Sequence, residues 1–319
     1  MNETIVSMDS ISKSFPGVKA LDHVHFELRS GEVMALLGEN GAGKSTLMKI
    51  LSGVYTRDEG SMAIFGKEYG DLSPKQAQEV GVAIIHQELN MCRHLSVAEN
   101  MFLGREKKKG IMLSNSEMEA EAQRILDELK IDLRPQQVVG DLPVSMQQMV
   151  EIAKALSTNA RILIMDEPTS ALTAREIEDL FRIIRDLKSK GCGIVYISHR
   201  LEELQHIVDR VTIMRDGQYI TSMNFKDATM DEIIANMVGR EIKEKFPRVE
   251  CEKGKLVLEV KNLNAGRLVR NVGFSLYEGE IVGFAGLMGA GRTETTRAIF
   301  GVDQKESGVI VLDLSLIHI

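Results

Sequence analysis

The sequence lacks the features that mark membrane-spanning, secreted and nucleic-acid-binding proteins. No apolar run approaches the roughly 18 residues of a membrane span, and the first residues lack the charged and apolar stretches of a secretion signal. The formal net charge is −7, whereas a nucleic-acid-binding surface is normally basic. Three scattered cysteines form no disulfide or metal pattern: Cys92, Cys192 and Cys251. We therefore expect a cytosolic protein without a nucleic-acid partner.

The remaining composition is that of an ordinary globular protein. Hydrophobic residues make up 44% and charged residues 27% of the 319 positions, and no low-complexity tract is present. Such a chain can bury a sizeable core. Its length allows one large α/β domain and part of another.

The most informative segment reads Gly-Glu-Asn-Gly-Ala-Gly-Lys-Ser-Thr at positions 38–46. It fits the pattern of a phosphate-binding loop, and it lies between an apolar run at 33–37 and a helical pattern up to Leu51, as such a loop requires. Backbone N–H groups and the positive end of the helix would bind phosphate. We expect Lys44 to reach the β- and γ-phosphates of ATP and the Ser45 hydroxyl to bind Mg²⁺. The loop residues assigned to ATP are Gly38, Glu39, Asn40, Gly41, Ala42, Gly43, Lys44, Ser45 and Thr46.

Apolar runs of strand length alternate with helical patterns along the chain. Buried strands are predicted at 33–37, 82–85, 162–165, 194–197 and 211–214. The apolar residues of 176–190 recur at the spacing of an amphipathic helix. This alternation predicts an α/β fold with a mostly parallel sheet covered on both faces.

One segment departs from this alternation. From about 90 to 158 helical patterns dominate, and we interpret this region as a helical insertion between strands. Ser116 and Glu119 have the spacing of a capping box, which predicts the start of a helix there.

An altered second copy of the phosphate loop, Gly-Leu-Met-Gly-Ala-Gly-Arg-Thr, occupies positions 286–293. It begins 248 positions after the first (286 minus 38), and the same offset relates Phe26 to Phe274 and Gly60 to Gly308. The chain is therefore interpreted as a tandem duplication of one nucleotide-binding unit. In the second loop Gly286, Gly291 and Thr293 keep the pattern, but Arg292 replaces the lysine. The wide, planar arginine head is a poor substitute for a buried ammonium.

The duplication divides the chain into domains. We expect a first domain over 1–240, a charged linker over 241–255 and the N-terminal part of a second copy over 256–313. Residues 314–319 match nothing in the repeat, and we expect them to be an atypical tail produced by truncation or a sequence artefact.

A pair of acidic residues, Asp166 and Glu167, follows the apolar strand predicted at 162–165. Asp166 is suited to hold Mg²⁺, and Glu167 is placed to polarise the water that attacks the γ-phosphate. Two acidic residues after a strand are a weak signal by themselves. About 120 residues after a complete phosphate loop, they predict the second half of an ATP-hydrolysing site.

With these motifs in order, the chain resembles the ABC-type ATPases. Gln87 resembles the Q-loop glutamine of that family, His199 its switch histidine, and Phe15 the aromatic residue on which adenine stacks. The resemblance implies a P-loop NTPase fold with an antiparallel β subdomain and a helical insertion. It also implies catalytic roles for Glu167, His199 and Gln87, and Mg²⁺ ligands from Ser45, Gln87 and Asp166.

Within that family the sequence is most similar to bacterial monosaccharide importers of the ribose and galactoside group, which carry two fused nucleotide-binding domains. The motifs that carry this similarity begin at Phe15, His86, Gln147, Asp166 and Met237. The resemblance implies three kinds of partner: membrane permease subunits, an extracytoplasmic sugar-binding protein acting indirectly, and a second nucleotide-binding domain. It also implies a peripheral location on the cytoplasmic face of the membrane.

Departures from the family pattern predict an asymmetric pair of sites. Where the family signature is Leu-Ser-Gly-Gly-Gln, this chain has Leu142, Pro143, Val144, Ser145 and Met146. Pro143 offers neither a hydroxyl nor an N–H to a γ-phosphate. The same offset of 248 places Leu263 opposite Phe15 in the second copy. We therefore expect one competent and one degenerate ATP site in the full-length relative.

Two other interpretations remain open at this point. One is a soluble ABC ATPase of translation or DNA repair, although basic surfaces and family-type signatures would then be expected. The other is a catalytically incomplete fragment, because the second signature is absent from these 319 residues. The sequence does not identify the sugar, since selectivity lies in the permease and the external binding protein.

Overall fold

The computed structural model describes residues 3–86, 90–110, 112–158, 160–170, 172–239, 253–287, 289–313 and 315–316. The chain divides into two compact units, residues 1–242 and 243–319. Most of the predicted linker, residues 241–252, lies outside the described residues, as does Arg240. Each unit is described by itself below.

A six-stranded sheet with the order β12-β11-β3-β10-β9-β6 forms the centre of the first unit. The pairings β11·β3, β3·β10, β10·β9 and β9·β6 are parallel, and β12 is an antiparallel edge strand. The strands are β3 (Val33–Leu37), β6 (Val82–Ile85), β9 (Ile162–Asp166), β10 (Gly193–Ile197), β11 (Arg210–Arg215) and β12 (Gln218–Asn224). The predicted parallel sheet is confirmed, with all five predicted strands in it.

A second, antiparallel sheet has the order β2-β1-β4-β5. Its strands are β1 (Thr4–Phe15), β2 (Val18–Arg29), β4 (Glu59–Ile64) and β5 (Lys67–Tyr69). Because side chains alternate along a strand, Met34 and Leu36 of β3 join the core beneath this sheet. Val33, Ala35 and Leu37 join a second core beneath the helices. β3 is therefore buried on both faces.

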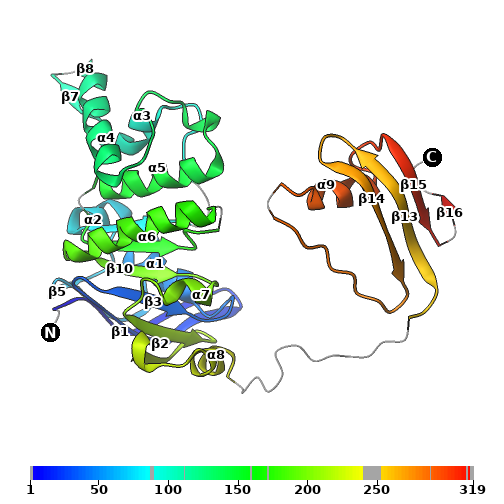
Figure 1. Ribbon diagram of the computed structural model, residues 1–319. Helices are drawn as coiled ribbons and strands as arrows, with labels where there is room; N and C mark the ends of the chain where they lie inside the picture. The colour runs from blue at the N-terminus through cyan, green and yellow to red at the C-terminus, as the bar shows by residue number, and fades with distance from the viewer. Residues whose placement is uncertain are drawn as a thin grey trace. The chain divides into compact units, whose positions relative to one another are not determined.

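Helices complete the first unit. Those associated with the two sheets are α1 (Lys44–Leu51), α2 (Pro74–Val80), α6 (Ala174–Ser189), α7 (Leu201–Leu204) and α8 (Met230–Val238). The predicted helical insertion contains α3 (Val97–Phe102), α4 (Asn115–Leu129) and α5 (Val144–Leu156), with a two-stranded ribbon of β7 (Lys108–Lys109) and β8 (Met112–Leu113). These helices gather at one end of the unit, away from β1 and β2 (Figure 1). None of the described helices is long and apolar enough to cross a membrane.

The predicted capping box at Ser116 and Glu119 is wrong. α4 begins at Asn115 after Ser114, whose side chain makes no capping hydrogen bond. Ser116 and Glu119 therefore lie inside the helix. The capping box of the insertion lies instead at Ser96 and Glu99, where each side chain accepts the other residue's backbone N–H.

The described part of the second unit repeats the antiparallel sheet of the first unit and the helix after the phosphate loop. Its sheet has the order β14-β13-β15-β16, and α9 packs against it. The elements are β13 (Leu256–Ala265), β14 (Val269–Tyr277), α9 (Arg292–Phe300), β15 (Ser307–Leu312) and β16 (Ser315–Leu316). β16 pairs with β15 as β5 pairs with β4.

The strand register shows that Leu263 corresponds to a different residue of the first unit from the one predicted. Val260 pairs with Phe274 as Met8 pairs with Phe26. Leu263 pairs with Val272 as Ile11 pairs with Val24, and both Leu263 and Ile11 are fully buried. Leu263 is therefore the counterpart of Ile11, and placing it opposite Phe15 was wrong.

The reason is a shorter hairpin in the second unit. The pairs Lys13↔Leu21 and Ala265↔Val269 are equivalent in the two hairpins. Residues 14–20 connect the first pair, but only residues 266–268 connect the second. The tip that carries Phe15 is thus missing from the second hairpin.

The counterpart of β3 in the second unit, residues 281–285, is not in a strand. Ile281 is 98% exposed and Phe284 42% exposed, whereas every residue of β3 is buried. In the first unit β3 lies between β10 and β11, which come more than 150 residues later in the chain. The described part of the second unit contains no such flanking strands, so the apolar sequence alone does not produce strand structure there.

This difference predicts the rate of backbone hydrogen exchange. Amides of residues 281–285 should exchange much faster than those of residues 33–37, because residues 281–285 form no strand hydrogen bonds and residues 33–37 lie inside a sheet. Mass spectrometry of peptides after deuterium labelling measures both in one sample, with β13 as the internal control for a folded second unit. Equal protection of 281–285 and 33–37 would contradict the description.

Candidate functional site

The loop of residues 38–43 leaves β3 and enters α1 at Lys44. Gly43 precedes the helix in the left-handed conformation, with φ of 93°. A Cβ at Gly43 would lie 2.6 Å from the carbonyl oxygen of Ala20, and one at Gly38 would lie 2.2 Å from that of Met214. Gly41 has φ of 86° but faces open space. Glycine is thus required at the two flanks by close packing and at Gly41 by backbone conformation.

Lys44 lies back over this loop. Its side chain is buried, and its ammonium donates hydrogen bonds to the carbonyl oxygens of Gly38 (2.7 Å) and Glu39 (3.0 Å). Burial lowers the pKa of the Lys44 ammonium, and the nearby carboxylates of Asp166 and Glu167 oppose this effect. A phosphate anion in the loop would provide a stronger acceptor than the two carbonyls.

Strands β9 and β10 deliver the other predicted residues to the same edge of the sheet. They are parallel neighbours, and Asp166 is level with Ile197 in the register. The Ser45 hydroxyl of α1 donates a hydrogen bond to Asp166 at 3.3 Å. The predicted magnesium ligands Ser45 and Asp166 are therefore adjacent, although 121 residues separate them in the sequence.

Glu167 and His199 face each other just beyond these strands. The Nε2 atom of His199 lies 2.8 Å from Oε1 of Glu167. Glu167 has φ of 50°, and its N–H donates to the carbonyl of Ile197 at 2.9 Å. A left-handed conformation is unusual for glutamate and is typical of functional sites, where surrounding structure must hold it.

The remaining predicted residues occupy separate places. Phe15 is half-buried at the tip of the β1–β2 hairpin. The predicted signature residues 142–146 cover the start of α5, where Pro143 precedes the helix and Val144 is 54% exposed. Gln87 lies outside the described residues.

The second phosphate loop keeps two of the left-handed glycines of the first but has a different side-chain arrangement. Gly289 and Gly291 have φ of 79° and 81°, close to the values of Gly41 and Gly43, and α9 begins at Arg292 as α1 begins at Lys44. Arg292 is exposed, however, whereas Lys44 is buried.

Sequence analysis missed Glu203, a buried carboxylate in α7. Its Oε2 atom accepts hydrogen bonds from the hydroxyls of Thr169 (2.9 Å), Tyr196 (2.9 Å) and Ser198 (3.4 Å). Its Oε1 atom accepts one from the Arg200 guanidinium at 3.2 Å. Burial raises the pKa of the Tyr196 hydroxyl, and the Glu203 charge raises it further.

These contacts connect the loop after Glu167 with both neighbours of His199 in the chain. Glu203 therefore holds the two loops that carry the Glu167–His199 pair. The sequence contains no signal for this role, because Glu203 and the exposed Glu202 beside it look alike in an amphipathic segment.

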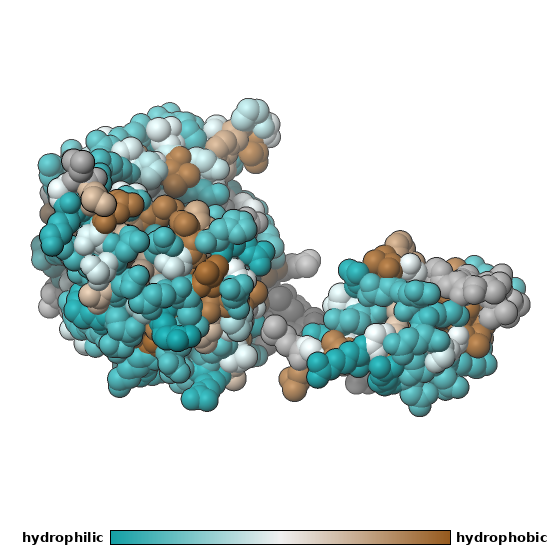
Figure 2. Space-filling view, turned by 90° about the horizontal axis from the view of Figure 1, so that it is seen from above, coloured by the Kyte–Doolittle hydropathy of each residue, from teal (hydrophilic) through white to brown (hydrophobic). Residues whose placement is uncertain are grey.

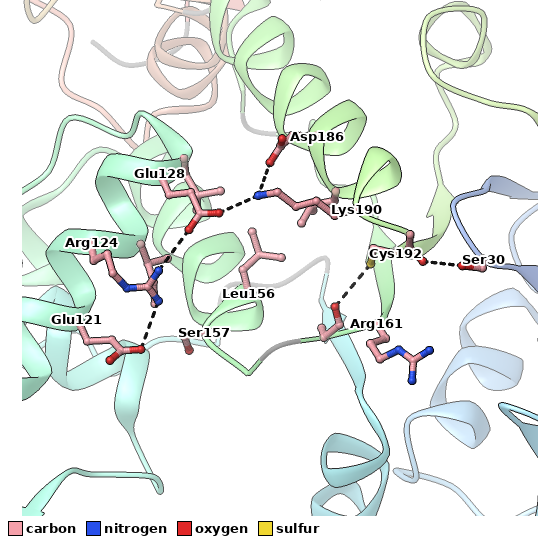
Figure 3. A pocket seen from close by; sticks show the side chains of 15 residues that line it. Ser30, Glu121, Arg124, Glu128, Leu156, Ser157, Arg161, Asp186, Lys190 and Cys192 are labelled. Atoms are coloured by element: carbon pink, nitrogen blue, oxygen red, sulfur yellow. Dashed lines mark hydrogen bonds and ion pairs between the residues drawn. The ribbon is translucent and has the colours of Figure 1, made fainter.

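A cavity of about 550 Å³ lies between the helical insertion and the end of α6 (Figure 3). On its wall the Lys190 ammonium is 2.7 Å from Glu128 of α4 and 2.8 Å from Asp186. Arg124 pairs with Glu121 and Glu128 on the same helix. These charged side chains pair with one another, so they link the insertion to α6 instead of offering free groups to a ligand.

Comparison with known proteins identifies the fold. Residues 21–170 match the family model described as ABC transporter. The chain is 27% identical to the crystal structure of a nucleotide-free ATP-binding cassette from an ABC transporter, with a TM-score of 0.65. That match covers 77% of this chain and 100% of the cassette. A cassette in its ADP conformation is 28% identical, with a TM-score of 0.63, and the match covers 76% of this chain and 99% of that one.

The fold is that of an ABC-type nucleotide-binding domain. The predicted P-loop NTPase fold is confirmed.

Longer relatives are also similar in sequence. The galactose/methyl galactoside import ATP-binding protein MglA of Escherichia coli is 50% identical over 312 residues, which are 97% of this chain and 62% of that protein. A protein of Agrobacterium fabrum, whose name refers to ribose/galactose/methyl galactoside import, is 54% identical over 97% of this chain and 61% of its own length. The chain thus spans about three fifths of the relatives that it matches.

Replacement of Glu203 by alanine should destabilise the first unit. The hydroxyls of Tyr196 and Thr169 would lose their acceptor, and we expect the free energy of unfolding to fall by about 2–5 kcal/mol. Urea denaturation followed by circular dichroism measures the loss. The matched control is Glu202→Ala, an exposed site at which the change should stay within about 0.5 kcal/mol. Equal effects of the two substitutions would show that the Glu203 contacts do not stabilise the protein.

Proposed function

We propose that this protein is the ATP-binding and ATP-hydrolysing subunit of an ABC transporter that imports monosaccharides of the ribose and galactoside type. The observation that carries the proposal is the arrangement of Lys44, Asp166, Glu167 and His199. They come from three segments of the chain, and their contacts place them at one edge of one sheet. The names of the relatives supply the substrate class and favour import over a soluble ATPase of translation or DNA repair.

The phosphates of ATP fit the loop at 38–46. Gly41 faces open space there, and the N-terminus of α1 points its N–H groups to the same region. Ser45 and Asp166 supply oxygen atoms of the kind that Mg²⁺ prefers, and Gln87 is proposed as a further ligand. The ion would neutralise charge on the β- and γ-phosphates.

Glu167 and His199 are proposed to act on the attacking water. Glu167 would orient and polarise the water as a general base, and the His199 ring would contact the γ-phosphate. Their short contact in this structure keeps both side chains at the edge of the phosphate site. Phe15 would hold the adenine ring by stacking.

We further propose that the chain is a first domain over 1–240, a linker over 241–255 and the start of a second copy over 256–313. The tail at 314–319 has an atypical sequence, although its residues 315–316 pair with β15 as β5 pairs with β4. In the complete protein the Lys44 loop would pair with the signature of the second domain. The Arg292 loop would pair with residues 142–146, in which Pro143 offers neither a hydroxyl nor an N–H to a γ-phosphate. One site would then hydrolyse ATP and the other would not.

A groove between the core and the helical insertion is the proposed contact for the permease. A cavity of about 650 Å³ is lined by α2, β6, α5 and the chain after α3. Leu103 on its rim is 43% exposed, and other hydrophobic side chains emerge through the hydrophilic surface of the insertion (Figure 2). Burial raises the pKa of Glu151 in its wall to about 7. Docking there would place the protein on the cytoplasmic face of the membrane.

The coupling proceeds through two states. Closure of two nucleotide-binding domains around ATP would move the permease, and hydrolysis would reset it. The extracytoplasmic sugar-binding protein would take part only through the permease.

Lys44→Ala should weaken MgATP binding, because the variant loses the ammonium that reaches the β- and γ-phosphates. We expect at least about a tenfold rise in the dissociation constant, the scale of one charged hydrogen bond. Isothermal titration calorimetry measures it. Arg292→Ala in the second loop is the matched control and should change the affinity far less. Unchanged affinity in Lys44→Ala would contradict the assignment of the loop.

Glu167→Gln should leave MgATP binding intact and abolish turnover, because glutamine keeps the shape of glutamate and loses its charge. In the full-length relative, phosphate release should fall at least about 100-fold. The exposed Glu178→Gln on α6 serves as the control. Release from this chain by itself should be slow, because its own signature at 142–146 is degenerate. Hydrolysis at the unmodified rate in Glu167→Gln would exclude Glu167 as the base.

A further inference from the structure

The tip of the β1–β2 hairpin is supported by an aromatic residue from another part of the chain. Tyr55 lies in the loop between α1 and β4, and its ring centroid is 5.3 Å from that of Phe15. The two rings meet edge to face at 66°. This geometry is favourable for aromatic pairs beyond the area they bury. The Phe15 ring therefore packs against Tyr55 and remains partly exposed.

Asp58, at the end of the same loop, holds the three residues that precede Phe15. Its carboxylate accepts hydrogen bonds from the Lys13 ammonium (2.7 Å) and the Ser14 N–H (2.6 Å), and its own N–H donates to the Ser12 carbonyl (2.9 Å). The hydrogen bond from Lys13 lowers the pKa of Asp58. The Lys13 ammonium also lies 5.8 Å from the centre of the Phe15 ring, within the range of a cation–π contact.

The loop that carries Tyr55 and Asp58 is fixed in turn to α1. The N–H groups of Val54 and Tyr55 both donate to the carbonyl of Lys49, at 2.8 and 3.0 Å. α1 begins at Lys44 in the phosphate loop. The same short helix thus connects the group that reaches phosphate with the residues that hold Phe15.

The second unit provides an internal comparison. Gly53 and Gly301 are equivalent left-handed glycines, with φ of 76° and 84°, so Asp303 occupies the place of Tyr55. Asp303 pairs with Arg297 of α9 instead of an aromatic ring. The unit whose hairpin lacks the Phe15 tip therefore also lacks the supporting tyrosine.

We propose that Tyr55 and Asp58 are positioning residues that hold the Phe15 ring against the nucleobase, and so set the affinity of the site for the base of its nucleotide. The proposal rests on the proposed function, because it takes the ligand to be ATP bound through the phosphate loop. Neither residue is among those assigned to the phosphates or the metal. Their effect should therefore fall on the base and leave phosphate binding unchanged.

The experiment compares two ligands that share their phosphates. MgATP and magnesium tripolyphosphate are titrated into the full chain by isothermal titration calorimetry. Tyr55→Ala and Asp58→Asn should each raise the dissociation constant for MgATP about three- to tenfold. The constant for magnesium tripolyphosphate should stay within about twofold of the unmodified protein's.

Three variants serve as controls. Tyr55→Phe keeps the ring and should bind MgATP as the unmodified chain does. Tyr69→Ala removes a tyrosine on β5, which lies in the same sheet away from the hairpin tip, and should bind both ligands normally. Lys44→Ala should weaken both ligands. Asp58→Asn and Tyr55→Phe are conservative substitutions. They can still be compared with the unmodified chain if Tyr55→Ala fails to fold.

Each other outcome overturns the proposal in its own way. Unchanged MgATP affinity in Tyr55→Ala and Asp58→Asn would show that the Phe15 ring needs no support. Equal weakening of both ligands would show a general structural role. An unmodified chain that binds neither ligand would contradict the proposed function, and the positioning role with it.

Discussion

The pairing of β3 with β10 and β11 is the constraint on which the rest of the structure depends. It buries a short apolar strand on both faces and fixes where the phosphate loop begins. It also brings the ends of β9 and β10 beside that loop, so Asp166, Glu167 and His199 lie at the same edge of the sheet. Ligands of open α/β sheets generally bind at the carboxyl ends of the strands for this reason. Residues 281–285 show that a similar sequence without the two flanking strands forms no strand and is exposed.

Much of this arrangement could be predicted from the sequence. The five predicted strands appear within one residue of the expected limits, because uninterrupted apolar runs bounded by loop residues leave little choice. The phosphate loop could be predicted because its glycines encode backbone conformation locally: Gly43 must be left-handed and must tolerate Ala20 at close range. The start of α4 could not be predicted in the same way. Ser114 with Glu117 and Ser116 with Glu119 both have capping spacing, and the helix begins after Ser114 without a capping hydrogen bond.

The parts that sequence analysis missed depend on contacts between distant segments. Glu203 acquires its role only when α7 brings it to Thr169 and Tyr196. Tyr55 meets Phe15, and Asp58 meets Ser14, only after the hairpin has folded against the loop that follows α1. The counterpart of Phe15 was misplaced because a constant offset cannot reveal a shorter hairpin, whereas strand register does.

The two copies together separate what local sequence determines from what the surrounding chain must supply. Left-handed glycines recur at equivalent places in both units, from Gly41 and Gly289 to Gly60 and Gly308. The second unit therefore keeps the left-handed turns at Gly289 and Gly291 of its phosphate loop. It lacks the buried ammonium, the aromatic tip and the tyrosine beside it. These differences all concern groups that would contact or support a nucleotide, while the glycines that shape the backbone are retained. A unit that had lost nucleotide chemistry but still had to fold would show this pattern, because backbone turns serve stability and the side chains serve the ligand.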